Sequence, residues 1–268
     1  MGLAEKISDS IVTNNIATEE SNIIDYLKVV KKKQKTIKYR KDGNVKMTRN
    51  NKIEGKASEV YPFKTKEEIN SIINVLNNHI DNATTSYNKK RWYRNKMIFV
   101  LGINLGIRGS DLCSLKWSDF FYEDMKFKNR TKIQPQKTKN KTKKYVSLSF
   151  NNTVKNIITE YVNEYPIENL DDYVFITTKG KHLDRDALGL IVKNVAKEAG
   201  IKFNVNSHSL RKTFGYRTWT NAIDKGEALS MLQYIFGHSS MKTTMRYIGI
   251  TQEQVDEIFQ NLNVDNWF

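Results

Sequence analysis

Residues 106–112, Gly-Ile-Arg-Gly-Ser-Asp-Leu, combine an arginine with a helix boundary. An apolar helix ending at Gly106 would be followed by a new helix that opens with Ser110 and Asp111 near its positive end. Arg108 would then lie at the corner between the two helices, where the Asp111 carboxylate can hold its guanidinium. A fixed planar fork of N–H donors suits bidentate binding of phosphate, whereas an ordinary structural Arg–Asp pair is the alternative interpretation.

A histidine and an arginine stand three residues apart in the segment Ser-His-Ser-Leu-Arg, residues 207–211. At that spacing His208 and Arg211 share one face of a helix. The pair offers a titratable ring and a permanent cation to the same point. Any helix can carry such a pair by chance, so it is informative only together with other motifs.

Residues 237–247 contain a second histidine and a tyrosine. Gly237 is expected to end a helix, which leaves His238 exposed at the corner. Ser239 or Ser240 would then cap a short helix that carries Tyr247. Because the chain has thirteen tyrosines, Tyr247 alone does not indicate a functional site.

The elements that must position these residues are mostly helices. Thr65 and Glu68 form a capping box before a helical row of apolar residues. Helical spacing continues over residues 92–104, 154–165 and 188–199, and a further capping box, at Thr251, opens an amphipathic, acidic tail helix over residues 251–262. The part of the chain from residue 61 onward is therefore predicted to be mainly helical.

One lysine-rich stretch has the alternation of β-strands. Apolar and polar residues alternate around residues 125–128 and 144–149, with polar turns between them. This pattern predicts a small antiparallel sheet of two or three strands. We expect a mainly α (α+β) domain over residues 61–268 with this basic β-hairpin inserted, preceded by a polar and basic segment over residues 1–60.

The positive charge of the chain is concentrated in two stretches. The 268 residues carry 44 Lys and Arg against 29 Asp and Glu, a net charge of +15. Residues 31–56 hold eleven basic and two acidic residues, and residues 126–144 hold nine basic residues and no acidic one. Such blocks fit a polyanion, because each phosphate that Lys or Arg neutralises releases counterions. For residues 31–56, a solvated or disordered basic segment is an equal alternative.

The composition also excludes several classes of protein. A single cysteine, Cys113, rules out an internal disulfide and a multi-thiolate zinc site, and four histidines disfavour a His-cluster metal enzyme. The longest apolar stretch has 11 residues, whereas a membrane span needs about 20. No secretory signal is evident, so we expect a soluble protein of a reducing, cytoplasmic compartment without a membrane partner.

Taken together, the motifs resemble the tyrosine recombinase (phage-integrase) family. The matching segments are GIRGSDLCSLKWSD at 106–119, HSLRKTF at 208–214 and FGHSSMKTTMRYIGI at 236–250, with the lysine-rich hairpin between the first two. The resemblance spans roughly residues 61–260 and fills the catalytic positions in order. It implies the family's helical catalytic domain and site-specific cleavage and rejoining of DNA through a 3′-phosphotyrosyl intermediate, without metal, other cofactor or ATP.

The resemblance also implies a role for each matching residue. Tyr247 matches the nucleophile, Arg108 and Arg211 match the pair that clamps the non-bridging phosphate oxygens, His238 matches a further donor to that phosphate, and His208 matches the acid/base that helps to deprotonate the tyrosine. Lys137 best matches the hairpin lysine that protonates the leaving 5′-oxygen, with Lys139 and Lys141 as close rivals. Asp111 would support Arg108, and Lys139, Lys141, Lys143 and Arg246 would contact the DNA backbone.

The family's partners are expected as well. They are double-stranded DNA, three further copies of this chain in a homotetramer on paired sites, and accessory DNA-bending proteins. The expected location is the nucleoid of a prokaryote, or a phage context. The tail helix 251–262 would pack into a neighbouring protomer or, as the alternative, in cis.

The sequence departs from the family at its beginning. Relatives usually place a helical core-binding domain of about a hundred residues before the catalytic domain. Here residues 1–60 would form a reduced core-binding element or a basic arm. A type IB topoisomerase-like relaxase and a non-catalytic DNA-binding regulator of the same fold are the alternative functions. A two-metal nuclease is disfavoured because no suitable carboxylate cluster stands out.

Overall fold

The computed structural model describes residues 59–136, 145–177 and 180–250 of the chain. These residues belong to the second of two compact units, Glu59–Phe268. The expectations for residues 1–58, for Lys137, Lys139, Lys141 and Lys143, and for the tail helix 251–262 lie outside the described residues. Where the structure describes the chain, no helix is long and apolar enough to cross a bilayer.

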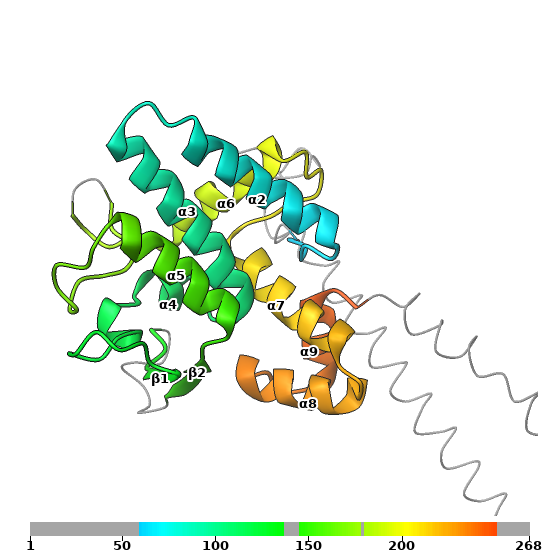
Figure 1. Ribbon diagram of the computed structural model, residues 1–268. Helices are drawn as coiled ribbons and strands as arrows, with labels where there is room; N and C mark the ends of the chain where they lie inside the picture. The colour runs from blue at the N-terminus through cyan, green and yellow to red at the C-terminus, as the bar shows by residue number, and fades with distance from the viewer. Residues whose placement is uncertain (1–58, 137–144, 178–179, 251–268) are drawn as a thin grey trace, which may run out of the picture. The chain divides into compact units, whose positions relative to one another are not determined.

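The described part is mainly helical, with one small sheet (Figure 1). In chain order the elements are α2 (Lys66–Asp81), α3 (Ser86–Leu105), α4 (Gly109–Cys113), the 3-10 helix η1 (Trp117–Asp119), β1 (Arg130–Ile133), β2 (Val146–Ser149), α5 (Asn152–Glu164), α6 (Arg185–Glu198), α7 (Ser207–Asn221), α8 (Lys225–Phe236) and α9 (Met241–Ile248). The predicted fold class is confirmed.

The helix boundaries follow from local chemistry. The capping box of Thr65 and Glu68 opens α2 as predicted. Of the two serines considered for α9, Ser240 is the cap, and its side chain accepts a hydrogen bond from the Thr243 N–H. Gly106 ends α3 with φ +61°, and Gly237 ends α8 with φ +65°. Both turns lie in the left-handed region that glycine adopts without strain.

The sheet begins later in the chain than the alternation predicted. β1 and β2 are antiparallel, with Arg130 opposite Ser149 and Ile133 opposite Val146. Residues 125–128 are not a strand, because Met125 has a φ of +62° and its N–H donates to the carbonyl of Tyr122. A residue in that conformation turns the chain. The strand predicted at residues 125–128 is thereby reduced to one isolated antiparallel bridge, between Phe121 and Phe127.

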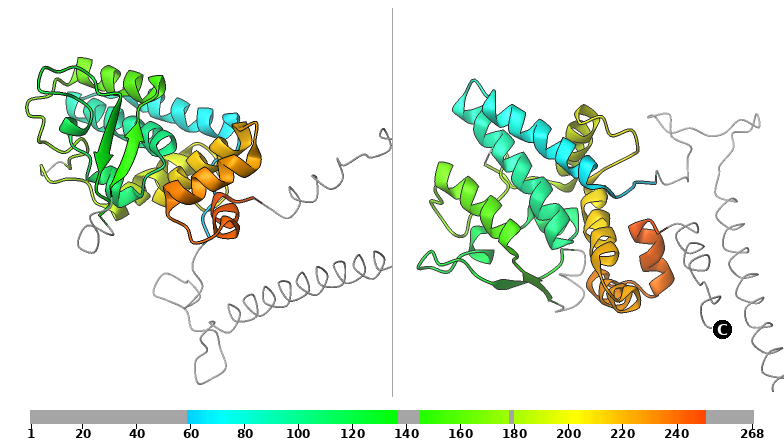
Figure 2. Two further views of the ribbon diagram at one scale, coloured as in Figure 1. Left: turned by 90° about the horizontal axis from the view of Figure 1, so that it is seen from below. Right: turned by 45° about the vertical axis from the view of Figure 1, so that its right-hand side comes forward.

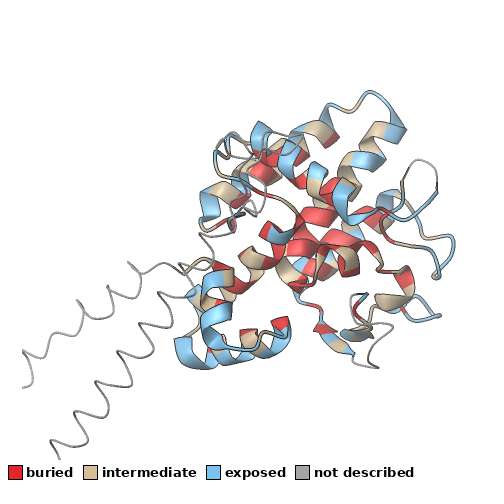
Figure 3. Cartoon of the chain, turned by 180° about the vertical axis from the view of Figure 1, so that it is seen from behind, coloured by how far each residue is buried: buried red, intermediate tan, exposed pale blue. Residues whose placement is uncertain are grey.

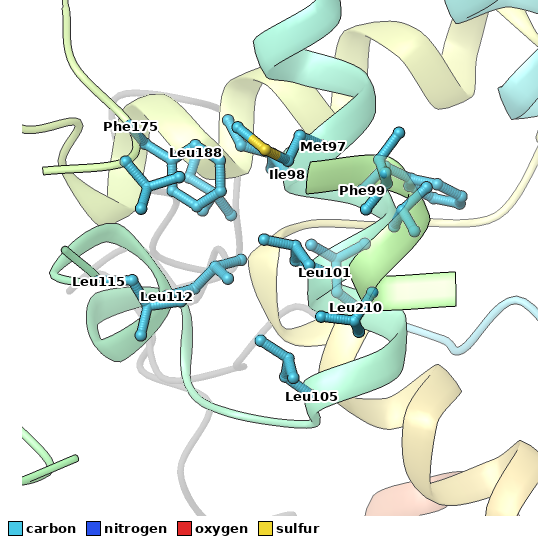
Figure 4. Packing of buried hydrophobic residues seen from close by; sticks show 14 of the residues in the cluster. Met97, Ile98, Phe99, Leu101, Leu105, Leu112, Leu115, Phe175, Leu188 and Leu210 are labelled. Atoms are coloured by element: carbon cyan, nitrogen blue, oxygen red, sulfur yellow. The ribbon is translucent and has the colours of Figure 1, made fainter. Parts of the chain in front are cut away.

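Helix α3 is the centre of the main core. Its residues Met97, Ile98, Phe99, Val100 and Leu101 are all buried although they are consecutive, so every face of the helix is covered by neighbours. Figure 3 shows the buried residues gathered in the middle of the molecule. In Figure 4 the side chain of Leu210, from α7, lies close to those of Leu101 and Leu105 of α3.

A second, smaller core lies between α8 and α9. Leu232, Phe236 and Ile248 are buried there, and side chains from the second half of α7 pack against them. Helix α7 therefore contributes to both cores, and α8 and α9 lie beside it (Figure 2). This arrangement brings the ends of α3 and α8 together with the middle of α7.

We expect Gly215→Ala to destabilise the protein, because α7 touches the second core through that glycine. An added Cβ would lie 2.5 Å from Cγ2 of Ile248 and 2.9 Å from a ring carbon of Phe236. Overpacking of this kind costs about 1–3 kcal/mol. Gly189→Ala in α6 is the control, since its nearest neighbour would be 3.8 Å away. That variant should gain about 0.5–1 kcal/mol from helix propensity. The free energy of unfolding of both variants is measured by denaturant titration. A change in the same direction for both substitutions would contradict this packing.

Candidate active site

Arg211 connects the ends of two helices. It lies in α7 and is only 5% exposed. Its Nη1 donates to the carbonyl oxygen of Gly106 at 2.6 Å, and its Nη2 donates to that of Phe236 at 3.2 Å. The guanidinium carbon also lies 4.3 Å from the centre of the Phe236 ring. Both carbonyls stand at helix C-termini, where the backbone carries partial negative charge. The planar fork is therefore held from several sides.

Arg108 reaches the same carbonyl from another element. Its backbone is extended at the position just before α4, and its Nη2 donates to the Phe236 oxygen at 3.4 Å. Two guanidinium groups thus approach one oxygen atom. Burial and the charge of Arg108 lower the pKa of Arg211 to about 10, against the opposing effects of Tyr247 and Asp111. An anion held by both groups would relieve this crowding of positive charge.

A cavity of about 280 Å³ opens beside the two arginines. It lies between the end of α3, strand β2 and α8, and its wall includes Arg108, Asp111, Arg211, Phe214 and Ile235. The two permanent cations give one side of this cavity a positive potential. A phosphate group is the kind of ligand that a pair of fixed forks binds well.

Tyr247 lies next to the arginine pair. Its ring, in α9, packs edge-on against the rings of Phe236 and His238, with centroids 5.3 and 5.0 Å away. Burial raises the pKa of the phenol, whereas the charges of Arg211 and Arg108 lower it. Because the net direction is upward, the hydroxyl stays protonated near neutral pH and needs a base to become a nucleophile.

His238 follows the glycine that ends α8 and is fixed by two bonds. Its backbone N–H donates to the carbonyl of Gln233 at 3.0 Å, and its Nδ1 lies 3.1 Å from the hydroxyl of the buried Thr244. These contacts orient the ring toward Tyr247. Burial and the charges of Arg211 and Arg108 lower the pKa of His238. The imidazole is therefore uncharged near neutral pH.

His208 is the second residue of α7 and is exposed. Its backbone N–H is capped by the side chain of Asn206 at 2.8 Å. Although part of the side chain reaches solvent, the protein around the ring removes some of its hydration, and this loss together with the charges of Arg185, Arg211, Lys212 and Arg108 lowers the pKa of His208. The imidazole is therefore neutral, and able to accept a proton, through the neutral pH range.

Asp111 makes a different contact from the one expected. Its buried carboxylate accepts a hydrogen bond from the backbone N–H of Gln136 at 2.8 Å, instead of pairing directly with Arg108. The bond ties α4 to the chain that follows β1. Arg246 is exposed on α9 and is not part of the cavity wall. Its role in DNA binding stays a prediction.

Two further basic residues near the site were not singled out from the sequence. Lys212 lies 5.4 Å from the centre of the Tyr247 ring, and Arg185, the first residue of α6, adds its charge to the field at His208. Lys212 directly follows Arg211 inside the motif at residues 208–214, and this position is the one sequence feature that could have drawn attention to it. No comparable sequence signal marks Arg185, because only the packing of α6 in the fold brings its charge near His208.

No group of three or more His, Cys, Asp or Glu side chains in the described ranges is arranged to hold a metal ion. The groups that come together here are instead cations, imidazoles and a phenol. Their arrangement suits chemistry on a bound oxyanion, in which a hydroxyl attacks while positive groups stabilise the developing charge.

Comparisons with known proteins point to one family. The model of the phage integrase family matches residues 63–254. A probable integrase/recombinase of Bacillus subtilis, YoeC, is 30% identical over 195 residues, which cover 72% of this chain and 92% of that protein. Tyrosine recombinase XerD of Oceanobacillus iheyensis is 27% identical over 181 residues, which cover 65% of this chain. The chain spans 56% of XerD, about half of that relative's length.

Solved structures have the same fold. The crystal structure of XerA recombinase gives a TM-score of 0.55 at 20% identity and covers 78% of this chain and 65% of its own. A structure of XerH site-specific recombinase bound to its difH substrate gives the same TM-score and identity, with coverage of 82% and 60%. The family expected from the motifs is thus confirmed over most of the chain: this protein belongs to the phage integrase family.

Proposed function

We propose that this protein is a site-specific recombinase that cleaves and rejoins DNA through a covalent bond to Tyr247. The observation that carries the proposal is the convergence of Arg108 and Arg211 on the Phe236 carbonyl, with the Tyr247 phenol within their field. Its relatives' names, probable integrase/recombinase and tyrosine recombinase, support the same activity.

In the proposed step, the Tyr247 oxygen forms a bond to the scissile phosphorus as the bond to the 5′-oxygen breaks. The product is a 3′-phosphotyrosyl ester and a free 5′-hydroxyl, and attack by a 5′-hydroxyl on that ester rejoins the strand. Negative charge builds on the non-bridging oxygens in the transition state. Arg108 and Arg211 are already oriented to stabilise that charge, so little reorganisation is needed during the reaction.

Two proton transfers accompany the exchange of bonds. His208 takes the proton of the phenol, which its neutral form allows. The leaving oxygen receives a proton from a lysine of the hairpin, for which Lys137 is our assignment and Lys139 and Lys141 are the rivals. His238 donates a further hydrogen bond to the phosphate. Asp111, on the cavity wall, supports this arrangement by holding the chain that follows β1 through its bond to the Gln136 N–H.

The substrate proposed is double-stranded DNA at a defined site, with Lys139, Lys141, Lys143 and Arg246 on its backbone. Four copies would assemble on two paired sites, with the tail helix docked on a neighbour, and accessory DNA-bending proteins would assist. The outcome would be integration, excision, inversion or resolution of a mobile element in the cytoplasm of a prokaryotic host. The crystal structure of XerH site-specific recombinase bound to its palindromic difH substrate supports a defined DNA site as the substrate class.

We expect Tyr247→Phe to bind DNA but to form no covalent adduct, because the substitution removes only the attacking oxygen. The measurement is an SDS-resistant protein–DNA band, formed with a nicked suicide duplex in EDTA. Binding is measured separately by a mobility shift. An adduct that survives in Tyr247→Phe would move the nucleophile elsewhere, and an adduct that requires divalent metal would refute the mechanism.

The rate of adduct formation at limiting DNA should fall on acidification with a midpoint below pH 6.5, the reference pKa of histidine. Burial and neighbouring cations lower the pKa of His208, so its base form persists to lower pH before it is lost. His208→Gln should remove this acid limb and His238→Gln should keep it. An acid limb that disappears only in His238→Gln would assign the base to the other histidine.

A further inference from the structure

The chain enters the domain through a segment that is tied to α7. We call residues 59–64 the entry segment. The side chain of Asn204, just before α7, donates to the carbonyl of Glu59 at 2.8 Å, and the Tyr61 N–H donates to the carbonyl of Asn204 at 3.0 Å. The Phe63 N–H donates to the hydroxyl of the fully buried Thr213 at 2.8 Å. The entry segment is therefore fixed along the helix that carries His208 and Arg211.

The same segment also touches the end of α9. Gly249 ends that helix, and a Cβ added there would lie 3.3 Å from Cδ of Pro62 and 3.8 Å from Cε of Lys64. The entry segment thus lies against both the helix with the arginine and the helix with the nucleophile.

Lys212 joins these parts directly. From α7, its Nζ donates to the carbonyl of Val60 at 2.7 Å and lies 5.4 Å from the centre of the Tyr247 ring. Burial lowers the pKa of this half-buried lysine, and Glu59 opposes that effect. An ammonium that is partly removed from water and near an aromatic ring is attracted by the negative face of the ring.

The contacts of Lys212 differ from those of Arg211, its neighbour in the chain. Arg211 bonds to the two helix-end carbonyls at the cavity, whereas Lys212 bonds to the entry segment and is not part of the cavity wall. Lys212 thus acts on the ring of Tyr247, while Arg108 and Arg211 act on its hydroxyl. The rings of Phe236 and His238 complete the surroundings of the phenol.

We propose that Lys212 is a positioning residue for Tyr247: it links the ring of the nucleophile to the Val60 carbonyl of the entry segment. The inference rests on the proposed function, because it presupposes that Tyr247 attacks DNA. Lys212 bonds to the entry segment and is not on the wall of the cavity beside the two arginines, so we expect it to affect the rate of the attack and not the strength of DNA binding. A small misplacement of an attacking atom is enough to slow a reaction severely.

The test compares Lys212→Met with Lys193→Met, which removes the same charge from an exposed position on α6. Adduct formation is followed in single turnovers at saturating protein, and the Kd for the same duplex is measured separately. We expect Lys212→Met to form the adduct about tenfold more slowly than the control variant, with a Kd within about twofold of it. Lys212→Arg should restore most of the rate, because it keeps a cation and a donor.

Three results would overturn the inference: a Lys212→Met rate equal to that of Lys193→Met, a loss confined to the Kd, or a Lys212→Arg rate as low as that of Lys212→Met. If Lys212→Met does not fold at the assay temperature, Lys212→Gln replaces it with the same expected results, since glutamine keeps a donor and loses the charge. Adduct formation by Tyr247→Phe would instead show that the proposed function is wrong. If only the positioning role of Lys212 is wrong, Tyr247→Phe still forms no adduct and the proposed function stands.

Discussion

The carbonyl oxygen of Phe236 receives N–H groups from both Arg108 and Arg211, and the rest of the site depends on that meeting. Two permanent cations repel each other, and their burial adds a cost in solvation. The last carbonyl of α8 offsets part of this cost, because helix C-termini carry partial negative charge. A phosphate would offset much more. The geometry therefore holds the two forks ready for an anion before one binds.

The scaffold makes this meeting possible through α7. Leu210 of this helix belongs to the main core around α3, while Phe214, one turn later, packs against the small core of α8 and α9. Arg211 lies between them and so reaches the ends of α3 and α8 together. Lys212 points to the entry segment and to the Tyr247 ring. One helix thus fixes the positions of the arginine pair, the Tyr247 ring and the entry segment relative to one another.

The sequence predicted those features that depend on local chemistry. The capping box at Thr65 and the helix ends at Gly106 and Gly237 were foreseen, because caps involve residues only a few positions apart. The residues around the arginine pair were named from motifs, since type and spacing identified the family. Their roles in catalysis stay predictions.

Contacts between distant parts of the chain could not be predicted in the same way. The Asp111 carboxylate bonds to Gln136, 25 residues away, and Lys212 bonds to Val60, 152 residues away. No local sequence pattern predicts contacts between residues that lie so far apart in the chain. The strand expected at residues 125–128 is reduced to a single bridge, between Phe121 and Phe127, for a related reason: alternation describes side chains, whereas the positive φ of Met125 is a property of the backbone.

The most direct test of the arginine clamp is a double-mutant cycle on the rate of adduct formation, using Arg108→Lys, Arg211→Lys and both together. Each single substitution keeps the charge and loses the fork, and should slow the reaction by about 10²–10³-fold. If both forks hold one phosphate, the double variant should be far less impaired than the product of the single losses, because the two residues act as a unit. Losses that simply multiply would show that the two arginines act on separate groups and would contradict the account.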